Sequence, residues 1–256
     1  RPNGRRGDVN LARPPHIVRF DCKFACHAIG SRRHIPYTSG ENTHTKTAAV
    51  IRKSQKGTAG MTETSTFFTV LTPTYNRAGT LHRVYESLSR QTFRDFEWVV
   101  VDDGSTDNTH EAVLEWQQRA DFPIRYVWQN NQHKKTAFNR GVREARGRMI
   151  VGLDSDDEMP PDSLATFKAA WDAIPPARRD SYVGSIVGDR YPQDVFDSTA
   201  VDIYFRYRIK GEKFGCMRTD ILRKYPFPED VAGFVPESLV WWAIARAGYL
   251  SRFINQ

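Results

Sequence analysis

Long apolar runs, cysteine and common phosphate-binding motifs are scarce or missing in this sequence of 256 residues. No apolar run approaches the roughly 20 residues that span a bilayer, and no charged-then-apolar leader with a cleavage site is present. Its three cysteines are too few for a disulfide framework, which favours a reducing compartment. These absences predict a soluble or peripheral protein of the cytoplasm, with peripheral attachment to the cytoplasmic membrane left open.

Two further absences narrow the chemistry. Cys22 and Cys26 lie near His27, but no second ligand pair with zinc spacing follows, and Cys216 stands alone. Neither a P-loop (GxxxxGKS or GxxxxGKT) nor a GxGxxG fingerprint occurs. The sequence therefore argues against a zinc module, an NTPase and a dehydrogenase.

The basic charge is confined to the N-terminal part of the chain. Residues 1–60 carry 12 Lys and Arg against 3 Asp and Glu, whereas residues 61–256 carry 25 against 27. Residues 1–60 contain no Met and little hydrophobic periodicity, so we expect a disordered basic extension, and whether it is native is left open. A basic arm for nucleic acid is the alternative, but we expect no nucleic-acid partner.

Residues 61–256 are predicted to form one catalytic domain of α/β class. Nearly unbroken apolar runs, such as Phe96 to Val101 and Met149 to Leu153, alternate with segments of helical periodicity such as Leu81 to Leu88. This alternation is typical of a mostly parallel sheet flanked by helices. The segment Tyr249 to Ile254 has the character of a strand rather than a tail, so we expect the domain to be truncated at its C-terminus.

Distinctive polar residues follow three of the predicted strands. Thr72-Pro73 closes the first strand, which we expect over Phe67 to Leu71, and Thr74 and Tyr75 follow it; Asp102-Asp103 ends another. Asp154-Ser155-Asp156 ends a third. Ligands of parallel sheets bind beyond the carboxyl ends of the strands, so these residues should meet in one crevice.

The acidic cluster after the third of these strands suggests a divalent cation. Asp154 and Asp156 are two residues apart and can face the same side of an extended chain. Their carboxylates are hard ligands suited to Mn²⁺ or Mg²⁺, which complete their shells with substrate phosphates. Capping of the following helix is the alternative role, and it also suits Asp157.

Three stretches together resemble the family 2 glycosyltransferases of GT-A fold, a Rossmann-like architecture. They are Thr72 to Arg77, Ser89 to Asp107 with its DDGSTD sequence, and Leu153 to Asp157. Their order and spacing match the family over about 95 residues. The resemblance implies transfer from a nucleoside-diphosphate sugar, usually a UDP-sugar, to a carbohydrate or lipid-linked acceptor, as in polysaccharide biosynthesis.

The resemblance also implies roles for individual residues. The donor would bind at the first strand end and at the turn of Asp102 and Asp103, with Thr74, Tyr75 and Asp103 at the base and ribose. Asp154 and Asp156 match the DXD element, which contacts the ribose and the metal on the diphosphate.

Lys134 is a candidate partner of the phosphates. Gln132 and His133 replace the glycines that are common in this stretch of the family. An exposed lysine at a helix start is the alternative.

A carboxylate must accept the proton of the acceptor hydroxyl, and Glu237 is the candidate base. Pro236 suits the first turn of a helix that would bury Leu239, Trp242 and Ala243 and expose Glu237 at its start. It resembles the late acidic position of the family. A glutamate favoured only by the helix dipole is the alternative role, and Asp189 and Glu229 are the alternative bases.

The predicted function is thus an inverting, metal-assisted glycosyltransferase. A catalytically inactive nucleotide-binding module and a nucleotidyltransferase are the alternatives. Five aromatic residues could stack on sugar rings but are predicted to be core: Tyr204, Phe205, Tyr207, Trp241 and Trp242.

Overall fold

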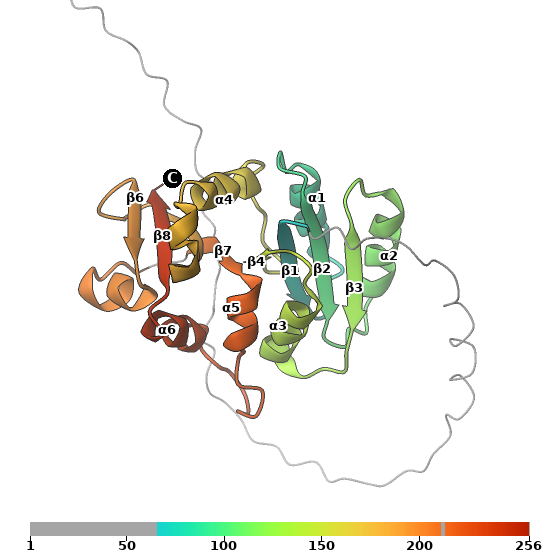
Figure 1. Cartoon of the computed structure of the whole chain (residues 1–256). Helices are drawn as coiled ribbons and strands as arrows, with labels where there is room; N and C mark the ends of the chain where they lie inside the picture. The colour runs from blue at the N-terminus through green and yellow to red at the C-terminus, as the bar shows by residue number, and fades with distance from the viewer. Residues whose placement is uncertain (1–65, 211–212, 256) are drawn as a thin grey trace, which may run out of the picture. The chain divides into compact units, whose positions relative to one another are not determined.

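The computed structural model describes residues 66–210 and 213–255 (Figure 1). The predicted extension 1–60, with Cys22, Cys26 and His27, lies outside the described residues. No helix in the described part of the chain is long and apolar enough to cross a membrane.

The described strands form one mixed sheet in the order β3-β2-β1-β4-β7-β5-β8-β6. Neighbours from β3 to β4 are parallel, β7 runs antiparallel to β4 and β5, β8 is parallel to β5, and β6 is antiparallel to β8. The strands are β1 (Phe68–Thr74), β2 (Phe96–Asp102), β3 (Ile124–Trp128), β4 (Met149–Gly152), β5 (Tyr182–Gly188), β6 (Val195–Ser198), β7 (Phe214–Arg218) and β8 (Leu250–Asn255).

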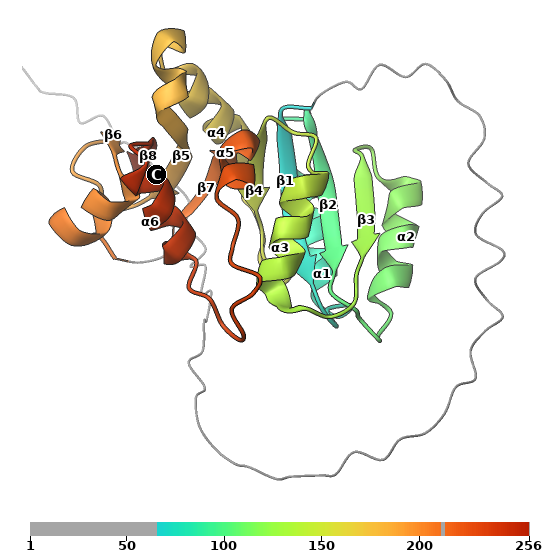
Figure 2. The same cartoon turned by 60° about the horizontal axis from the view of Figure 1, so that its bottom comes forward.

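Helices cover both faces of this sheet, so the predicted α/β class and the mostly parallel sheet flanked by helices are confirmed (Figures 1 and 2). On one face lie α1 (Leu81–Ser89), α2 (Thr109–Arg119) and α4 (Ser163–Asp172). On the other lie α3 (His133–Glu144), α5 (Thr219–Lys224) and α6 (Ser238–Arg246). A 3₁₀ helix (Pro176–Ser181) lies between α4 and β5, and a short π-helix (Asp202–Arg206) lies between β6 and β7.

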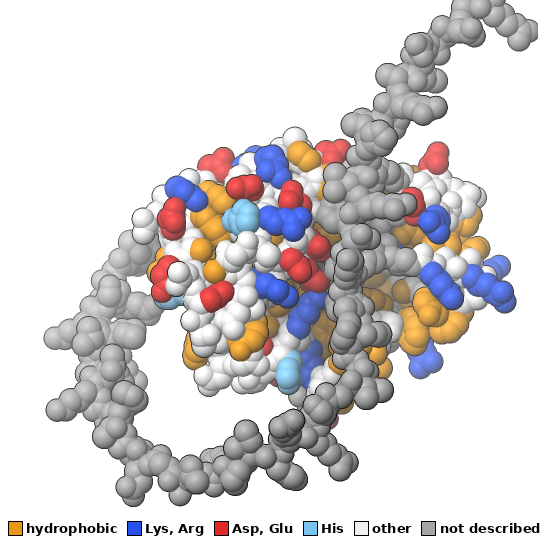
Figure 3. Space-filling model, turned by 180° about the vertical axis from the view of Figure 1, so that it is seen from behind, with side chains coloured by type: hydrophobic (Ala, Val, Ile, Leu, Met, Phe, Trp, Pro, Cys, Tyr) orange, Lys and Arg blue, Asp and Glu red, His pale blue; other side chains and the backbone are white. Residues whose placement is uncertain are grey.

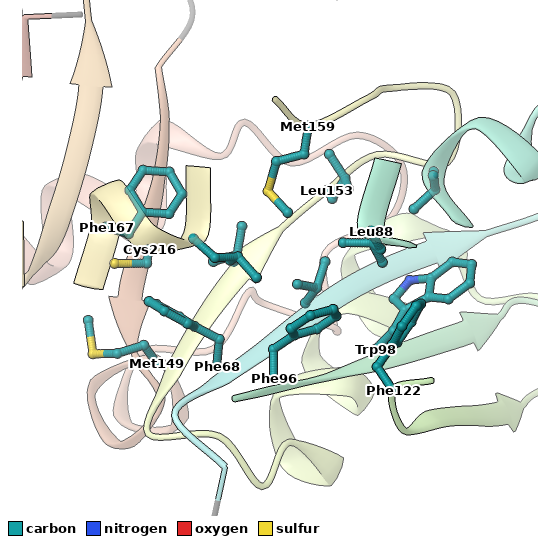
Figure 4. Packing of buried hydrophobic residues seen from close by; sticks show 14 of the residues in the cluster. Phe68, Leu88, Phe96, Trp98, Phe122, Met149, Leu153, Met159, Phe167 and Cys216 are labelled. Atoms are coloured by element: carbon teal, nitrogen blue, oxygen red, sulfur yellow. The ribbon is translucent and has the colours of Figure 1, made fainter. Parts of the chain in front are cut away.

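The larger core cluster lies under α1, α2 and α4. Figure 4 shows Phe68, Phe96 and Met149 from three adjacent strands packed together, with Phe167 of α4 next to Cys216 of β7. Cys216 is a free, fully buried cysteine, and burial raises the pKa of its thiol to about 12. It therefore serves the core as a small apolar residue.

The first strand is longer than predicted, because it continues through Thr72-Pro73 to Thr74. Leu71 O accepts a hydrogen bond from Leu153 N on the β4 side, and Thr74 O accepts one from Asp103 N on the β2 side. Pro73 faces the same side as Leu71, where the pairing with β4 has ended. Its missing N–H group therefore costs the sheet no hydrogen bond.

The predicted buried face of the last helix was wrong. Leu239 is 51% exposed and Ala243 is exposed, whereas Val240, Ile244 and Ala245 are buried. Val240 and Ile244 belong to the core cluster of α3 and α5, so the neighbouring helices select a face rotated by one residue.

The prediction that the five aromatic residues are core was also wrong for two of them. Tyr204 and Phe205 are exposed, and both rings contact Trp242, with centroids 5.7 Å and 5.2 Å away. These side chains form an aromatic cluster at the surface.

Basic and acidic side chains are mixed on one visible face of the described residues (Figure 3). The face in Figure 3 shows Lys and Arg interspersed with Asp and Glu. This pattern fits the near balance of 25 basic and 27 acidic residues over 61–256.

Candidate active site

The carboxyl ends of β4, β1, β2 and β3 lie side by side at one edge of the sheet, and the first three of these are the strand ends that carry the polar residues singled out in the sequence. The loops that follow them are joined by hydrogen bonds. Asp103 N donates to Thr74 O at 2.8 Å, and Thr80 Oγ1 donates to the backbone oxygen of Ser155 at 3.2 Å. The loop after β1 thus lies between the two acidic turns and contacts both.

Asp102 is fully buried and holds the turn after β2. Its Oδ1 accepts a hydrogen bond from Ser105 N at 2.8 Å, and its Oδ2 accepts one from the Tyr126 hydroxyl at 2.5 Å. Burial and the hydrogen bond to Asp102 raise the pKa of Tyr126. Gly104, with φ of +85°, completes the turn in a conformation that disfavours other residues.

The neighbouring Asp103 leaves one oxygen without a hydrogen bond in the described ranges. Its Oδ1 accepts from Gln129 Nε2 at 2.7 Å and from Gln132 N at 2.9 Å, but its Oδ2 accepts from no group in residues 66–210 and 213–255. The buried Thr74 Oγ1 also has no partner there, and Tyr75, which follows, is 48% exposed. An acceptor oxygen and an exposed aromatic ring at one strand edge can bind a planar, hydrogen-bonding group.

Lys134 brings together two residues that the sequence predicted separately. Its Nζ lies 2.8 Å from Asp154 Oδ1 and 3.6 Å from Glu237 Oε1. Lys134 is in the first turn of α3, Asp154 follows β4, and Glu237 immediately precedes α6. All three side chains are partly exposed, so a ligand can reach this charged cluster.

Asn139 ties the chain segment before Glu237 to α3. Asn139 is buried; its Nδ2 donates to Phe227 O and to Glu229 Oε1, each at 2.8 Å, and its Oδ1 accepts from Phe227 N at 2.9 Å. The same helix therefore carries Lys134 and fixes the segment that leads to Glu237.

Lys135 adds a second tie to this segment. Its buried ammonium group donates to the backbone oxygens of Val231 and of Gly233, the latter at 3.3 Å. The sequence analysis missed both Lys135 and Asn139 as positioning residues. No spacing rule distinguishes them from other polar residues of a helix start, because their partners are about 90 residues away in the chain.

We expect Asn139→Ala to lower both thermal stability and any activity that depends on Glu237. The substitution leaves the N–H and the carbonyl of Phe227 without their partners in a buried place, at about 1–3 kcal/mol each. Differential scanning calorimetry should show a transition several degrees lower. Asn130→Ala, at an exposed asparagine before α3, should leave the transition unchanged. Equal transition temperatures for the two variants would show that the hydrogen bonds of Asn139 to Phe227 do not stabilise the fold.

The alternative bases have other partners. Glu229 accepts hydrogen bonds from Asn139 and from Arg143 Nη1, the latter at 3.1 Å. The hydrogen bond from Asn139 lowers the pKa of the Glu229 carboxyl. Asp189 follows β5, and its Oδ1 lies 3.6 Å from Arg190 Nε. Glu229 thus pairs with Asn139 and Arg143, and Asp189 with Arg190.

The candidate metal ligands near β4 are of a type that suits Mg²⁺ or Mn²⁺, but they are few. Asp154 and Asp156 offer hard carboxylate oxygens, and Asp156 is exposed. Within the described ranges, no three His, Cys, Asp or Glu side chains gather so as to hold an ion. An ion at these residues would take its other ligands from water and from a bound phosphate group.

Comparisons with known proteins agree on one family. The protein-family model described as Glycosyl transferase family 2 matches residues 69–225. Glycosyltransferase GlyA of Streptococcus pneumoniae is 31% identical over an alignment of 147 residues that covers 52% of this chain and 20% of that protein. A GalNAc(5)-diNAcBac-PP-undecaprenol beta-1,3-glucosyltransferase of Campylobacter jejuni is 35% identical over 100 residues, 38% of this chain and 32% of that protein. The chain spans about a third or less of the length of these relatives.

Two solved structures share the fold. Mannosyltransferase PcManGT of Pyrobaculum calidifontis, in complex with GDP-Man and Mn²⁺, aligns with a TM-score of 0.55 and 26% identity over 75% of this chain and 55% of that one. S. aureus TarS 1-349 in complex with UDP-GlcNAc aligns with a TM-score of 0.60 and 22% identity over 74% and 56%. Since the family model covers more than half of the sequence and both the motifs and the fold agree with it, the chain belongs to glycosyl transferase family 2.

Proposed function

We propose that this chain transfers a sugar from a nucleoside-diphosphate sugar, a UDP-sugar, to an acceptor hydroxyl. The observation that carries the proposal is the cluster in which Lys134 lies 2.8 Å from Asp154 and 3.6 Å from Glu237. One ammonium group and two carboxylates at the carboxyl edge of a parallel sheet supply both a phosphate partner and a proton acceptor.

The donor would lie along the loops after β1 and β2. Tyr75 and the second oxygen of Asp103 would receive the base and ribose, while Asp102 keeps the turn in shape through its bonds to Ser105 and Tyr126. Lys134 would bind the diphosphate as a point charge. The two similar solved structures hold UDP-GlcNAc and GDP-Man, which supports a donor of this class.

Glu237 would accept the proton of the acceptor hydroxyl as that oxygen attacks the anomeric carbon. Its carboxylate is about half exposed and lies 3.6 Å from the Lys134 ammonium group, so an acceptor hydroxyl can reach it beside the donor site. Direct displacement with one base inverts the anomeric carbon. A bound Mn²⁺ or Mg²⁺ would supply Lewis-acid stabilisation of the leaving diphosphate, with Asp154 and Asp156 as its protein ligands.

The acceptor would be a carbohydrate or a lipid-linked carbohydrate. The name of the Campylobacter jejuni relative includes an undecaprenol-linked substrate, which supports the lipid-linked class. Such an acceptor implies work at the cytoplasmic surface of a membrane by peripheral attachment.

Titration calorimetry of UDP into the full chain, with and without Mn²⁺, tests the donor site. We expect Mn²⁺-dependent binding that Asp156→Ala weakens at least about tenfold, because a charged metal ligand is lost. Asp162→Ala, at an exposed acid before α4, should bind as the parent does. A folded sample that binds neither UDP nor GDP in any metal condition would refute the proposal.

Two other functions predict different results from the same titration. An inactive nucleotide-binding module would bind UDP but transfer no sugar from any donor. A nucleotidyltransferase would prefer a nucleoside triphosphate, but the loop Thr74 to Arg77 lacks the glycines typical of that class. Testing UDP, UTP and donor hydrolysis side by side separates the three.

A further inference from the structure

A charged cavity lies away from the candidate active site, around the chain segment that enters β4. Asp154 follows the carboxyl end of β4, whereas Arg146 and Arg148 precede its amino end. The cavity has a volume of about 360 Å³ and is lined by five arginines: Arg146, Arg148, Arg179, Arg218 and Arg223. Asp180 and Asp220 are the acidic side chains of its lining. Since the domain as a whole has nearly balanced charge, this local excess of cations calls for an explanation.

The segment that carries Arg146 and Arg148 is held by its backbone. Arg146 N donates to Glu97 Oε1 at 2.8 Å, and Gly147 N donates to Thr69 Oγ1 at 2.9 Å. A Cβ atom at Gly147 would lie 2.3 Å from the Thr69 nitrogen, so only a glycine allows the backbone to pack this closely against β1. This side of the cavity is therefore rigid without any contribution from the two guanidinium groups.

Two of the arginines are anchored through backbone oxygens at helix ends. Arg179 donates to the oxygens of Asp172 and Ile174, each at 3.0 Å, at the end of α4. Arg223 donates to the oxygen of Ala145 at 2.7 Å, at the end of α3. These bonds fix the two cations against the ends of helices.

Arg218 is anchored by a carboxylate. Its Nε and Nη2 bind the two oxygens of Asp220 at 3.0 Å and 2.6 Å, which neutralises one acid of the lining. Asp180 is fully exposed and only 3.9 Å from Arg218, so it contributes a weak, solvated contact.

The other two arginines of the cavity have no hydrogen-bond acceptor among the described residues. The exposed side chains of Arg146 and Arg148 make no hydrogen bond or ion pair with residues 66–210 and 213–255, although Arg148 stacks 5.5 Å from the Trp171 ring. Trp171 lines the same cavity, is 99% buried, and has an Nε1–H group without a partner in the described part of the chain. The guanidinium groups of Arg146 and Arg148 thus keep hydrogen-bond donors for which the described residues offer no acceptor.

We infer that this cavity is a second ligand site, separate from the sugar-donor site, that binds a phosphate-bearing anion. Guanidinium groups pair with phosphate oxygens through two parallel hydrogen bonds, and here two of them are exposed and unpaired. The unprotonated oxygens of a phosphate group accept hydrogen bonds, which matches the free donors of Arg146 and Arg148. The anion is either a soluble phosphorylated compound or the headgroup of an anionic phospholipid, since both present the same group.

Inorganic pyrophosphate is the probe for the soluble source, titrated into the full chain in EDTA. The double variant Arg146→Gln and Arg148→Gln should lose at least about tenfold in affinity, because two charge-assisted contacts are removed. Its fold should persist, since neither side chain has a polar partner among the described residues. The matched control is Arg190→Gln with Arg246→Gln, which removes two exposed arginines outside the lining and should bind as the parent does.

Pyrophosphate can also bind beside Lys134, so the Lys134→Ala variant is titrated in parallel. Binding that survives in Lys134→Ala but not in the double variant belongs to the arginine cavity. The indole ¹H–¹⁵N signal of Trp171 is assigned as the one that disappears in Trp171→Phe. This signal should shift when pyrophosphate is added, whereas binding elsewhere on the surface would leave it unchanged.

Sedimentation with vesicles distinguishes the lipid source. If the ligand is a headgroup, the parent chain should sediment with vesicles of phosphatidylcholine and phosphatidylglycerol. The double variant should then stay in the supernatant. Retention with weak pyrophosphate binding identifies a lipid, and the reverse result identifies a soluble compound. If the double variant and the parent behave alike towards both probes, the inference is wrong.

Discussion

Glu237→Gln should abolish sugar transfer while leaving UDP binding within a few-fold of the parent. Glutamine keeps the size of the side chain at the start of α6 but cannot accept the acceptor's proton. Loss of a general base lowers kcat by about 100- to 10,000-fold. Release of UDP in the presence of donor and acceptor measures turnover, and calorimetry of UDP measures binding.

The alternative bases provide the controls for this prediction. Asp189→Asn should change kcat little, because Asp189 contacts Arg190 rather than the cluster of Lys134. Glu229→Gln retains an oxygen for Asn139, so its effect should be limited to a modest loss of stability. If either control loses turnover and Glu237→Gln does not, the base is assigned to the wrong residue.

Gly184→Ala should destabilise the domain by about 4 kcal/mol or prevent its folding. Gly184 lies in β5, and a Cβ atom there would be 1.8 Å from the backbone oxygen of Cys216 in β7. The collision involves the backbone of a buried strand, so no side-chain rotation can relieve it. The free energy of unfolding in urea measures the effect.

Gly79→Ala is the matched control for the same chemical change. A Cβ atom at Gly79 would have no atom within 4 Å, and its backbone is outside the positive-φ region. The unfolding free energy should change by about 0.5 kcal/mol in either direction. Equal losses in the two variants would contradict the close approach of β5 and β7.

Much of the sheet and part of the site follow from local sequence. The apolar runs before Asp102 and Asp154 predict β2 and β4, and the helical periodicity of Leu81 to Leu88 predicts α1. The acidic turns lie at the carboxyl edge because parallel strands end together there. These features depend on hydrophobic periodicity and on turn chemistry, which neighbouring residues determine.

Other features depend on contacts between segments far apart in the chain. The strand β7, inserted antiparallel between β4 and β5, the buried face of α6, and the ties from Lys135 and Asn139 to residues 227–233 have no local signal. The arginine cavity is likewise lined by residues from segments far apart in the chain, between positions 145 and 223. The sequence by itself thus determined the family motifs, the α/β alternation and the edge where the polar residues gather. Only the tertiary structure decided which distant side chains meet, because the packing that selects them exists only in the folded chain.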